Sequence, residues 1–253
     1  MTDHEGLSRR VRHGDVDLHV LDTGDRGDGR PPVLFVPGLT DVALDYVEVL
    51  ADFGRRTVVV DLRGRGGSSS PAAGYATEDH VGDIAAVVEA TGLDAFHLAT
   101  FSRGTAYGLS YAFEHPERVL SVTVGDYEAV EIGIPGGRWP DAFVGGHWRG
   151  RPVLERISEV ALTSIAVQSR QQDFFDRLAG LDRPLQVVRG GMPNASGFVF
   201  VDDEAVARFR EAVPDVVVHT FAESRHDLFR PDRRRYPRVV AAFAAAHDPV
   251  VAP

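Results

Sequence analysis

Residues 96–108, FHLATFSRGTAYG, decide the fold of this chain. The stretch begins as a short apolar run that stops at Ser102, and small and apolar residues then return at helical spacing through Tyr107. A strand that breaks at a Ser and restarts as a helix presents the hydroxyl at the tip of a tight turn. There it lies beside the free N–H groups of a helix N-terminus. We therefore expect a strand, a sharp turn at Ser102 and a helix.

The turn fits the pattern G-x-S-x-G, the nucleophile elbow, in which a Ser side chain is exposed between a strand and a helix. This chain reads Thr100-Phe101-Ser102-Arg103-Gly104, so the trailing Gly is present and Thr replaces the leading one. The place of Ser102 between a buried strand and a helix makes it a candidate nucleophile. The alternative is a Ser that caps the N-terminus of the helix, which requires the same backbone.

The composition narrows the classes of function. The 253 residues suit one α/β domain with a large core, and the net charge of −10 argues against nucleic-acid partners and anionic membranes. The absence of Cys excludes disulfides, thiolate metal sites and a Cys nucleophile. All 27 basic residues are Arg, so the Gly/Ser-rich stretch 61–71 lacks the Lys of a P-loop. With no apolar signal-peptide core and no apolar run of the ~18–20 residues that span a bilayer, we expect a cytoplasmic protein.

Apolar runs and amphipathic stretches alternate along most of the chain. An antiparallel hairpin is expected first, with 9–12 against 16–21. Continuous apolar runs, typical of parallel strands buried on both faces, follow at 33–36, 56–61, 119–124, 185–188 and 216–221. Helical patterns lie at 41–53, 77–91, 202–212 and 236–246. This order predicts right-handed crossovers and an α/β fold with a doubly wound, mostly parallel sheet.

The alternation lapses between residues 128 and 182. That span contains both Trp residues, several Gly and Pro, and helical patterns near 153–167 and 172–178. We interpret it as a small helical insertion over the carboxyl ends of the strands, with 1–127 and 183–253 as the core. We see no internal repeat and no linker long enough for a second independent domain.

Three further phrases extend the pattern: DLRGRGGSSSP at 61–71, HPERV at 115–119 and SRHDLF at 224–229. With the elbow and the order of elements, they resemble the α/β-hydrolase superfamily over about residues 30–246. The resemblance implies an α/β-hydrolase fold with a small helical cap at 128–182, where members usually differ in substrate. It also implies a Ser nucleophile, followed in the chain by an acid and a His.

A Ser hydroxyl needs a base within hydrogen-bond reach before it can act as a nucleophile. The same resemblance implies which residue is this base. The superfamily places a His in the loop after its last strand, and here that position is His226. Two other histidines, His219 and His97, lie inside predicted strands and are expected to face the core or a packed layer.

The acid departs from the common pattern of the superfamily. The loop after the penultimate strand has no carboxylate, because Pro193 or Asn194 stands at the usual position. In a known variant of the family the acid follows the strand after the elbow helix. This chain has Asp126 there, able to accept a hydrogen bond from His226. Glu128 is the reserve candidate, and the alternative for Asp126 is an ordinary turn residue at a strand end.

The negative oxygen of a tetrahedral intermediate needs preorganised donors, the oxyanion hole. These are expected to be the backbone N–H groups of Arg103, next to the nucleophile, and of Leu39. Pro37 replaces a His that is frequent in the superfamily and leaves the Leu39 donor intact. The Arg103 side chain is expected to form a salt bridge at the helix start or to bind an anionic substrate.

Large apolar side chains predict an apolar substrate pocket beneath the insertion: Leu39, Phe101, Tyr127, Trp139, Phe143 and Trp148. The alternative for the aromatic residues of the insertion is a small core of its own. Asp61, Arg63 and Asp83 are assigned to the scaffold. No spacing of His, Asp and Glu predicts a metal site.

We therefore expect a cofactor-independent serine hydrolase that cleaves an ester, lactone or thioester of a small apolar molecule, through a Ser102-His226-Asp126 triad and an acyl-enzyme. Alternatives on the same triad are an acyl-transferring or cyclising enzyme of secondary metabolism and an enzyme that cleaves C–C bonds. Epoxide hydrolases and haloalkane dehalogenases of this fold are disfavoured, since they need Asp at position 102. From another class, a ligand-binding member without turnover is the alternative. The expected partner is a small-molecule substrate; its identity and the oligomeric state stay open.

Overall fold

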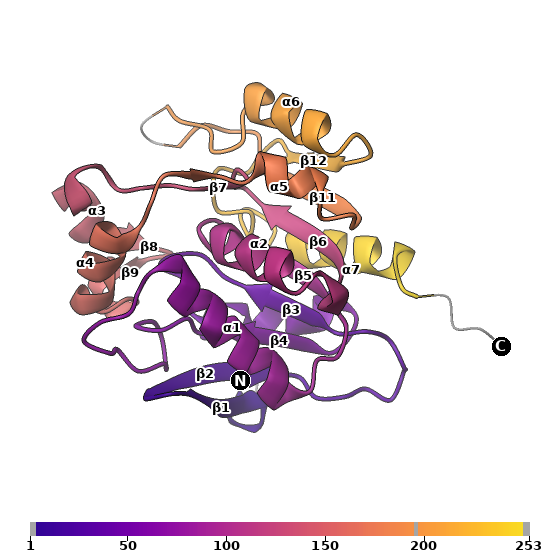
Figure 1. The fold of residues 1–253 in the computed structure, drawn as a ribbon, viewed down its shortest axis with the longest axis horizontal. Helices are drawn as coiled ribbons and strands as arrows, with labels where there is room; N and C mark the ends of the chain where they lie inside the picture. The colour runs from indigo at the N-terminus through magenta and orange to yellow at the C-terminus, as the bar shows by residue number, and fades with distance from the viewer. Residues whose placement is uncertain (1–3, 195–196, 250–253) are drawn as a thin grey trace.

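The computed structural model describes residues 4–194 and 197–249. Within these residues the central sheet has eight strands, in the order β1-β2-β4-β3-β5-β6-β11-β12 (Figure 1). β1 pairs antiparallel with β2, and β2 with β4, whereas the pairs from β4 to β12 are parallel. The predicted doubly wound, mostly parallel sheet is therefore confirmed. Its strands are β1 (Ser8–His13), β2 (Val16–Asp22), β3 (Val33–Val36), β4 (Thr57–Val60), β5 (Phe96–Thr100), β6 (Val119–Gly125), β11 (Leu185–Gly190) and β12 (Val217–Phe221).

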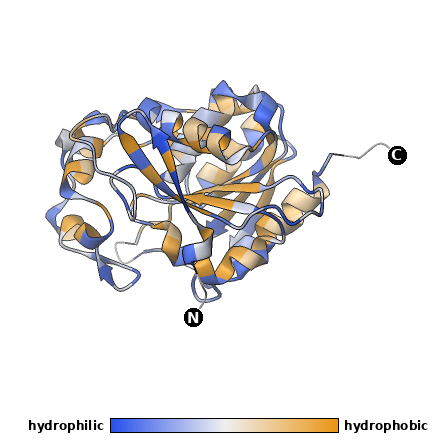
Figure 2. Cartoon of the chain, turned by 90° about the horizontal axis from the view of Figure 1, so that it is seen from below, coloured by the Kyte–Doolittle hydropathy of each residue, from blue (hydrophilic) through white to orange (hydrophobic). Residues whose placement is uncertain are grey.

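Helices cover both faces of this sheet. Apolar side chains of α1 (Thr77–Thr91), α2 (Gly104–Glu114) and α6 (Asp203–Ala212) pack on one face. Those of η2 (Ala43–Phe53) and α7 (Arg235–Ala246) pack on the other. Because successive strand residues point to opposite faces, the buried apolar runs of β3 and β4 contribute to both cores. Figure 2 shows apolar residues concentrated along the central strands.

The helix that follows β3 is of a different type from the α-helix that the sequence pattern suggests. A helix over 41–53 is present from Ala43, but it is wound as a 3-10 helix. A 3-10 helix has three residues per turn, so side chains three apart lie on one face. The buried side chains recur with mostly this spacing, at Ala43, Tyr46, Val49, Leu50 and Phe53.

The segment 128–182 is less helical than predicted. It contains α3 (Asp141–Val144), α4 (Glu159–Gln168) and α5 (Phe175–Ala179). Gly and Pro are frequent between them, and both residues are poor helix formers. The segment also forms two small antiparallel sheets, β7 (Val130–Glu131) with β10 (Gln172–Asp173) and β8 (His147–Trp148) with β9 (Arg151–Pro152).

Two parts of this segment pack differently. Phe175 and Leu178 of α5 belong to the main core on the α6 face. A separate apolar cluster includes Ile157 and Leu162 and extends to Leu39, in the loop after β3. The residues around α4 therefore lie over the carboxyl ends of the parallel strands (Figure 1).

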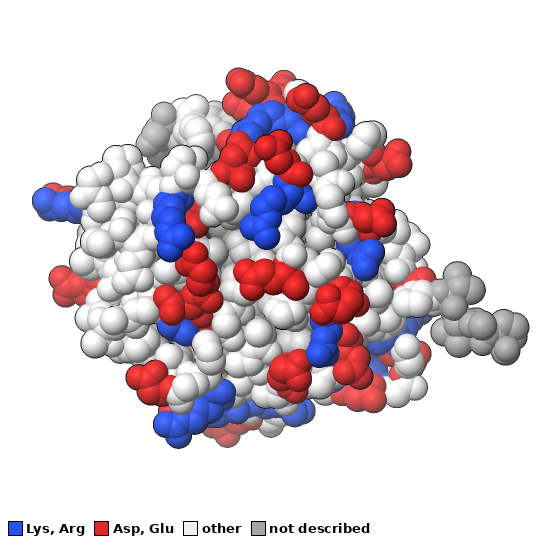
Figure 3. Space-filling model, viewed as in Figure 1, with Lys and Arg blue, Asp and Glu red and all other residues white. Residues whose placement is uncertain are grey.

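Charges of both signs are interspersed on the surface. On the face shown in Figure 3, Arg side chains lie beside Asp and Glu. Surface ion pairs include Arg118 with Glu89 at 2.8 Å and Arg170 with Glu78 at 3.0 Å. In the part of the chain that the structure describes, every helix is too short or too polar to cross a membrane.

Candidate active site

Ser102 occupies the turn between β5 and α2. Its φ is 52°, a left-handed conformation that is uncommon for residues other than Gly. The N–H of Ser102 donates to the carbonyl of Gly125 at 2.7 Å. A Cβ on Gly104 would lie 2.3 Å from the carbonyl oxygen of Pro37, so the trailing Gly of the elbow is needed for this close packing. The turn is thus held by the backbones of two neighbouring strands.

Thr100 replaces the leading Gly of the elbow pattern without disturbing the turn. Its hydroxyl donates to the carbonyl of Thr123 at 3.1 Å and lies 2.9 Å from the hydroxyl of Thr105. Its carbonyl accepts a hydrogen bond from the hydroxyl of Tyr236 at 2.5 Å. A Cβ on Gly108 would lie 2.6 Å from the Thr100 methyl group. Gly108 of α2 therefore provides the space that the larger side chain requires.

The loop after β12 brings His226 to Ser102. Nε2 of His226 lies 2.8 Å from Ser102 Oγ, and Nδ1 lies 2.8 Å from Asp126 Oδ2. The imidazole is stacked on Phe200, with ring centroids 3.7 Å apart, and packs against Phe101 at 5.2 Å. These aromatic contacts hold the ring plane, so both nitrogens keep their partners.

Asp126 follows β6 and is fixed by the neighbouring strand. Its φ is 44°, and its backbone N–H donates to the carbonyl of Val188 at 2.8 Å. Oδ1 accepts from the N–H of Gly190, also at 2.8 Å, while Oδ2 faces His226. The side chain is 2% exposed. The carboxylate is thereby held between β11 and the imidazole.

The segment after β3 passes directly beside the nucleophile candidate. A Cβ on Gly38 would lie 3.0 Å from Ser102 Cβ and 2.5 Å from Asp41 Oδ2, so only Gly permits this approach. Asp41 Oδ2 accepts from the Gly38 N–H at 3.0 Å. The Arg65 Nε donates to the carbonyl of Leu39 at 2.9 Å. Both peptide groups next to Ser102 are therefore oriented by buried side chains.

Arg103 combines an unused backbone donor with a fixed side chain. Among the described residues, neither its N–H nor that of Leu39 has a backbone acceptor. The side chain donates to the Tyr107 hydroxyl and to the Ile132 carbonyl, both at 3.1 Å. Its Nη2 lies 3.9 Å from Glu131. The predicted salt bridge is thus a loose one to β7, and the guanidinium connects α2 to the insertion.

A cavity of about 290 Å³ opens beside Ser102 and His226. The structure brings all five predicted substrate-binding residues to its wall: Phe101, Tyr127, Trp139, Phe143 and Trp148. Trp139 and Phe143 also pack on the apolar cluster of the insertion, so they belong both to the cavity wall and to that small core.

Sequence reasoning missed other parts of the cavity wall, namely Thr40, Asp41, Ile132, Ile134 and Phe200. The alternation of apolar residues in VEIGI, 130–134, was the one local signal for the two Ile side chains. Phe200 reaches the cavity from the connection between β11 and α6, and nothing in its neighbourhood in the sequence marks it.

The other candidate acids and bases lie outside this arrangement. Glu128, the reserve acid, pairs with Arg208 at 3.3 Å. His219 is half-buried in β12. His97 is buried in β5, as predicted, and desolvation by burial lowers its pKa to about 4 although Asp248 hydrogen-bonds to it.

The residues assigned to the scaffold make internal contacts. Arg63 donates two hydrogen bonds of 2.6 Å to Asp83. Asp61 lies 2.6 Å from His19 Nδ1 and accepts from the N–H of Ala43. Within the described ranges, no three His, Asp or Glu side chains are grouped so as to hold a metal ion.

Curated proteins share parts of this sequence. A sequence profile described as the alpha/beta hydrolase fold matches residues 31–126. The dihydrolipoyllysine-residue acetyltransferase component of the acetoin cleaving system of Cupriavidus necator is 29% identical over 199 residues, 74% of this chain and 51% of that protein. The N-formylmaleamate deformylase of Pseudomonas putida is 37% identical over 97 residues, 37% of this chain and 35% of that protein. The chain therefore spans about half or less of the length of these relatives.

Solved structures extend the likeness to nearly the whole chain. The enol-lactonase from Burkholderia xenovorans LB400 superposes with a TM-score of 0.79 over 94% of this chain and 100% of that one. The two sequences are 16% identical, so this likeness concerns the fold alone.

Proposed function

We propose that this chain, which has the α/β-hydrolase fold, is a cofactor-independent serine hydrolase. Its substrate is an ester, lactone or thioester of a small, mainly apolar molecule. One observation carries the proposal. Ser102, His226 and Asp126 are joined by two contacts of 2.8 Å at the wall of an apolar cavity.

His226 is the general base of the first step. Its Nε2 accepts the proton of the Ser102 hydroxyl as Oγ attacks the carbonyl carbon of the substrate. Asp126 accepts a hydrogen bond from Nδ1–H, which selects the tautomer with a free Nε2 and stabilises the imidazolium that forms. Because Oδ1 of Asp126 is already bound by the Gly190 N–H, the carboxylate is oriented before substrate arrives.

The N–H groups of Leu39 and Arg103 are the donors to the oxyanion. Both flank Ser102, and neither has a backbone acceptor in the described chain. Donors fixed in place before the reaction stabilise the tetrahedral intermediate without reorganising, and each contributes on the order of 10²–10³-fold in rate. The hydrogen bonds of the Gly38 N–H to Asp41 and of Arg65 to the Leu39 carbonyl hold the peptide groups on either side of the first donor.

The remaining steps complete one turnover. Imidazolium His226 donates its proton to the leaving alcohol or thiol, which departs as the carbonyl of the acyl-enzyme re-forms. A water molecule then loses a proton to His226 Nε2 and attacks the acyl carbon. Collapse of the second tetrahedral intermediate breaks the bond to Ser102 Oγ, and His226 returns the proton to that oxygen.

The cavity supports the choice of substrate class. It holds about 290 Å³, near the lower end of small-molecule sites, and its wall is rich in aromatic and aliphatic side chains. A deformylase shares part of this sequence, and an enol-lactonase shares the fold. A small acyl compound with an apolar body suits both observations.

A fluorophosphonate probe tests the proposal, because it labels an activated Ser covalently. We expect the wild-type protein to be labelled at Ser102, and Ser102→Ala and His226→Ala to remain unlabelled. Ser121→Ala, which removes another Ser that lies near a His, is the matched control and should label at the wild-type rate. Incubation with esters of increasing acyl length, followed by product identification, would then define the substrate.

The opposite result favours a ligand-binding member of the fold. In that case the wild-type protein stays unlabelled, while a small apolar ligand raises its melting temperature. That pair of results would exclude the hydrolase proposal.

A further inference from the structure

The turn between β8 and β9 carries a residue in an unfavourable conformation. The register pairs Trp148 with Arg151, which leaves Arg149 and Gly150 as a two-residue turn. Their φ angles are 49° and 82°. Turns with two positive φ angles favour Asn, Asp and Gly at the first position. An Arg there is strained, and such strain persists where the surrounding structure holds it in place.

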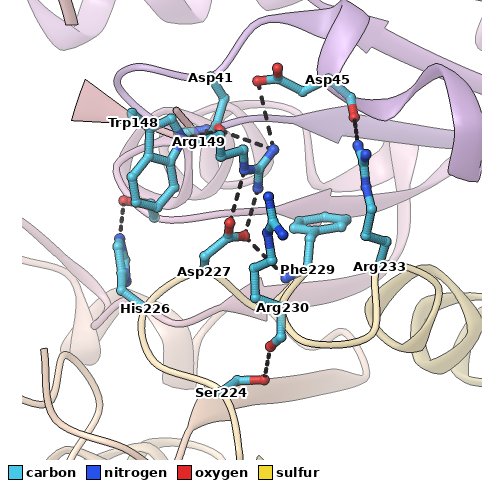
Figure 4. A network of polar contacts seen from close by, with 12 residues as sticks. Asp41, Asp45, Trp148, Arg149, Ser224, His226, Asp227, Phe229, Arg230 and Arg233 are labelled. Atoms are coloured by element: carbon cyan, nitrogen blue, oxygen red, sulfur yellow. Dashed lines mark hydrogen bonds and ion pairs between the residues drawn. The ribbon is translucent and has the colours of Figure 1, made fainter. Parts of the chain in front are cut away.

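The side chain of Arg149 is held by three carboxylates from two other segments. It is 9% exposed and donates twice to Asp227, at 2.8 and 3.1 Å. Nη1 lies 3.3 Å from Asp41 and 3.6 Å from Asp45. Figure 4 shows Arg149 between these three residues. The guanidinium also lies over the Phe229 ring, 4.9 Å from its centroid.

Two of these carboxylates adjoin the proposed catalytic groups. Asp227 directly follows His226 in the chain. Asp41 accepts from the N–H of Gly38, the residue before the proposed oxyanion donor Leu39. The base loop and the oxyanion segment come from distant parts of the sequence, and one guanidinium binds both.

Two further hydrogen bonds hold the same two segments. The indole Nε1 of Trp148, next to Arg149, donates to Asp41 at 2.7 Å. Ser224 donates to the carbonyl of Arg230 and closes the base of the His226 loop, while Arg149 holds its tip at Asp227 (Figure 4). The third carboxylate, Asp45, has a second cationic partner in Arg156 and depends less on Arg149.

We propose that Arg149 is a positioning residue, which through Asp227 and Asp41 holds the His226 imidazole and the Leu39 N–H in their reactive arrangement. This inference rests on the proposed hydrolase function. Arg149 is not among the residues that line the cavity. Its loss should therefore lower kcat and leave KM nearly unchanged, because substrate binding does not involve it.

Arg149→Gly is the principal test, since Gly relieves the strained φ and so limits the loss of stability. The rate constant kcat is expressed per labelled site, that is, per Ser102 that reacts with a fluorophosphonate when labelling is complete. We expect this kcat to fall by about 10²-fold, with KM changed less than about threefold. Arg149→Lys keeps the charge but cannot bind a carboxylate with two parallel hydrogen bonds, so it should recover roughly a tenth of the wild-type kcat.

Two control variants separate positioning from stability. Arg55→Ala breaks another pair of a buried Arg and a carboxylate, Arg55 with the half-buried Asp248, remote from Ser102. Arg151→Ala removes an exposed Arg from the same hairpin. Both should retain wild-type kcat per labelled site, although Arg55→Ala lowers the melting temperature. Asp227→Asn serves where Arg149→Gly does not fold, with an expected loss of about tenfold in kcat.

Several results would overturn the inference. The first is a wild-type kcat per labelled site in Arg149→Gly, or in Asp227→Asn if Arg149→Gly does not fold. This result would show that neither the His226 loop nor the segment with Asp41 needs the contact with Arg149. An equal loss in Arg55→Ala would show that stability alone is responsible. A raised KM with unchanged kcat would place Arg149 in substrate binding. In each case the wild-type protein is labelled, so the hydrolase function stands; an unlabelled wild-type protein would exclude both proposals.

Discussion

Of the three Ser–His–Asp sets among the described residues, two lie at opposite ends of the parallel strands, and the third joins Ser8, His19 and Asp61. At the carboxyl ends, His226 lies 2.8 Å from both Ser102 and Asp126. Toward the amino ends, His97 Nδ1 lies 2.8 Å from Ser121 Oγ, and its Nε2 lies 3.1 Å from Asp248. Distances among the three side chains alone hardly distinguish these sets.

Their surroundings differ in every other respect. Ser121 is buried within β6, and Asp248 is already bound by the buried Arg55. Ser102 lies instead on a strained turn before a helix, at the wall of a cavity, and Gly38 of the proposed oxyanion segment packs against it. A Ser–His–Asp set therefore needs access and oxyanion donors before it can act as a catalyst.

Removing the two serines should have the most unequal effects. Ser102→Ala is expected to lower kcat by about 10⁶-fold, as when the nucleophile of a serine protease is removed. Ser121→Ala should leave kcat unchanged, because its hydroxyl has no access to substrate. Steady-state kinetics on the first active ester compares them, and similar losses in both variants would contradict the assignment.

The two acids give the next largest contrast. Asp126→Asn should lower kcat by about 10⁴-fold, because His226 then loses the partner that selects its tautomer. Asp248→Asn should leave kcat unchanged but lower the free energy of unfolding by about 2 kcal/mol, since buried Arg55 loses its carboxylate. Kinetics and urea unfolding measure both quantities. Near-normal kcat in Asp126→Asn would move the role to Glu128 or remove it.

The proposed oxyanion segment adjoins Ser102, and a substitution of Gly38 tests its role. Gly38→Ala would place a Cβ 2.5 Å from Asp41 Oδ2 and 3.0 Å from Ser102 Cβ. The displaced Leu39 N–H should reduce kcat by about 10²-fold. Gly6→Ala, where a Cβ meets nothing within 4 Å, is the matched control and should behave as wild type. An unaltered kcat in Gly38→Ala would show that Leu39 is not a donor.

The set of Ser121, His97 and Asp248 should affect the free energy of unfolding and not kcat. Burial lowers the pKa of His97 from 6.5 to about 4, so the unfolded chain takes up this proton at a higher pH than the folded one. The free energy of unfolding should therefore decrease as pH falls from about 6.5 to 4, by up to about 3 kcal/mol from this group. Urea unfolding across this range should show a smaller decrease in His97→Gln. Parallel curves for the two proteins would contradict this account.

Much of the fold was predictable because hydrophobic periodicity is local. The apolar run of β3 and the amphipathic pattern of α1 appear in the structure with the predicted ends. The juxtaposition of Ser102, His226 and Asp126 was also expected, since the resemblance to the α/β-hydrolase superfamily implies it, and their catalytic roles stay a prediction. The winding of η2 and the short strands of the insertion were not, because Gly, Pro and tertiary packing outweigh weak local preferences there.

The sequence by itself determined the alternation of strands and helices, the break at Ser102, and the absence of a carboxylate after the penultimate strand. Only the tertiary structure decided that Asp126 and not Glu128 faces His226, that Phe200 stacks on the imidazole, and that Arg149 binds two distant loops. Periodicity reports which side of its own element a residue occupies. The distance between residues on different loops depends instead on how the whole sheet and insertion pack, which no local stretch encodes.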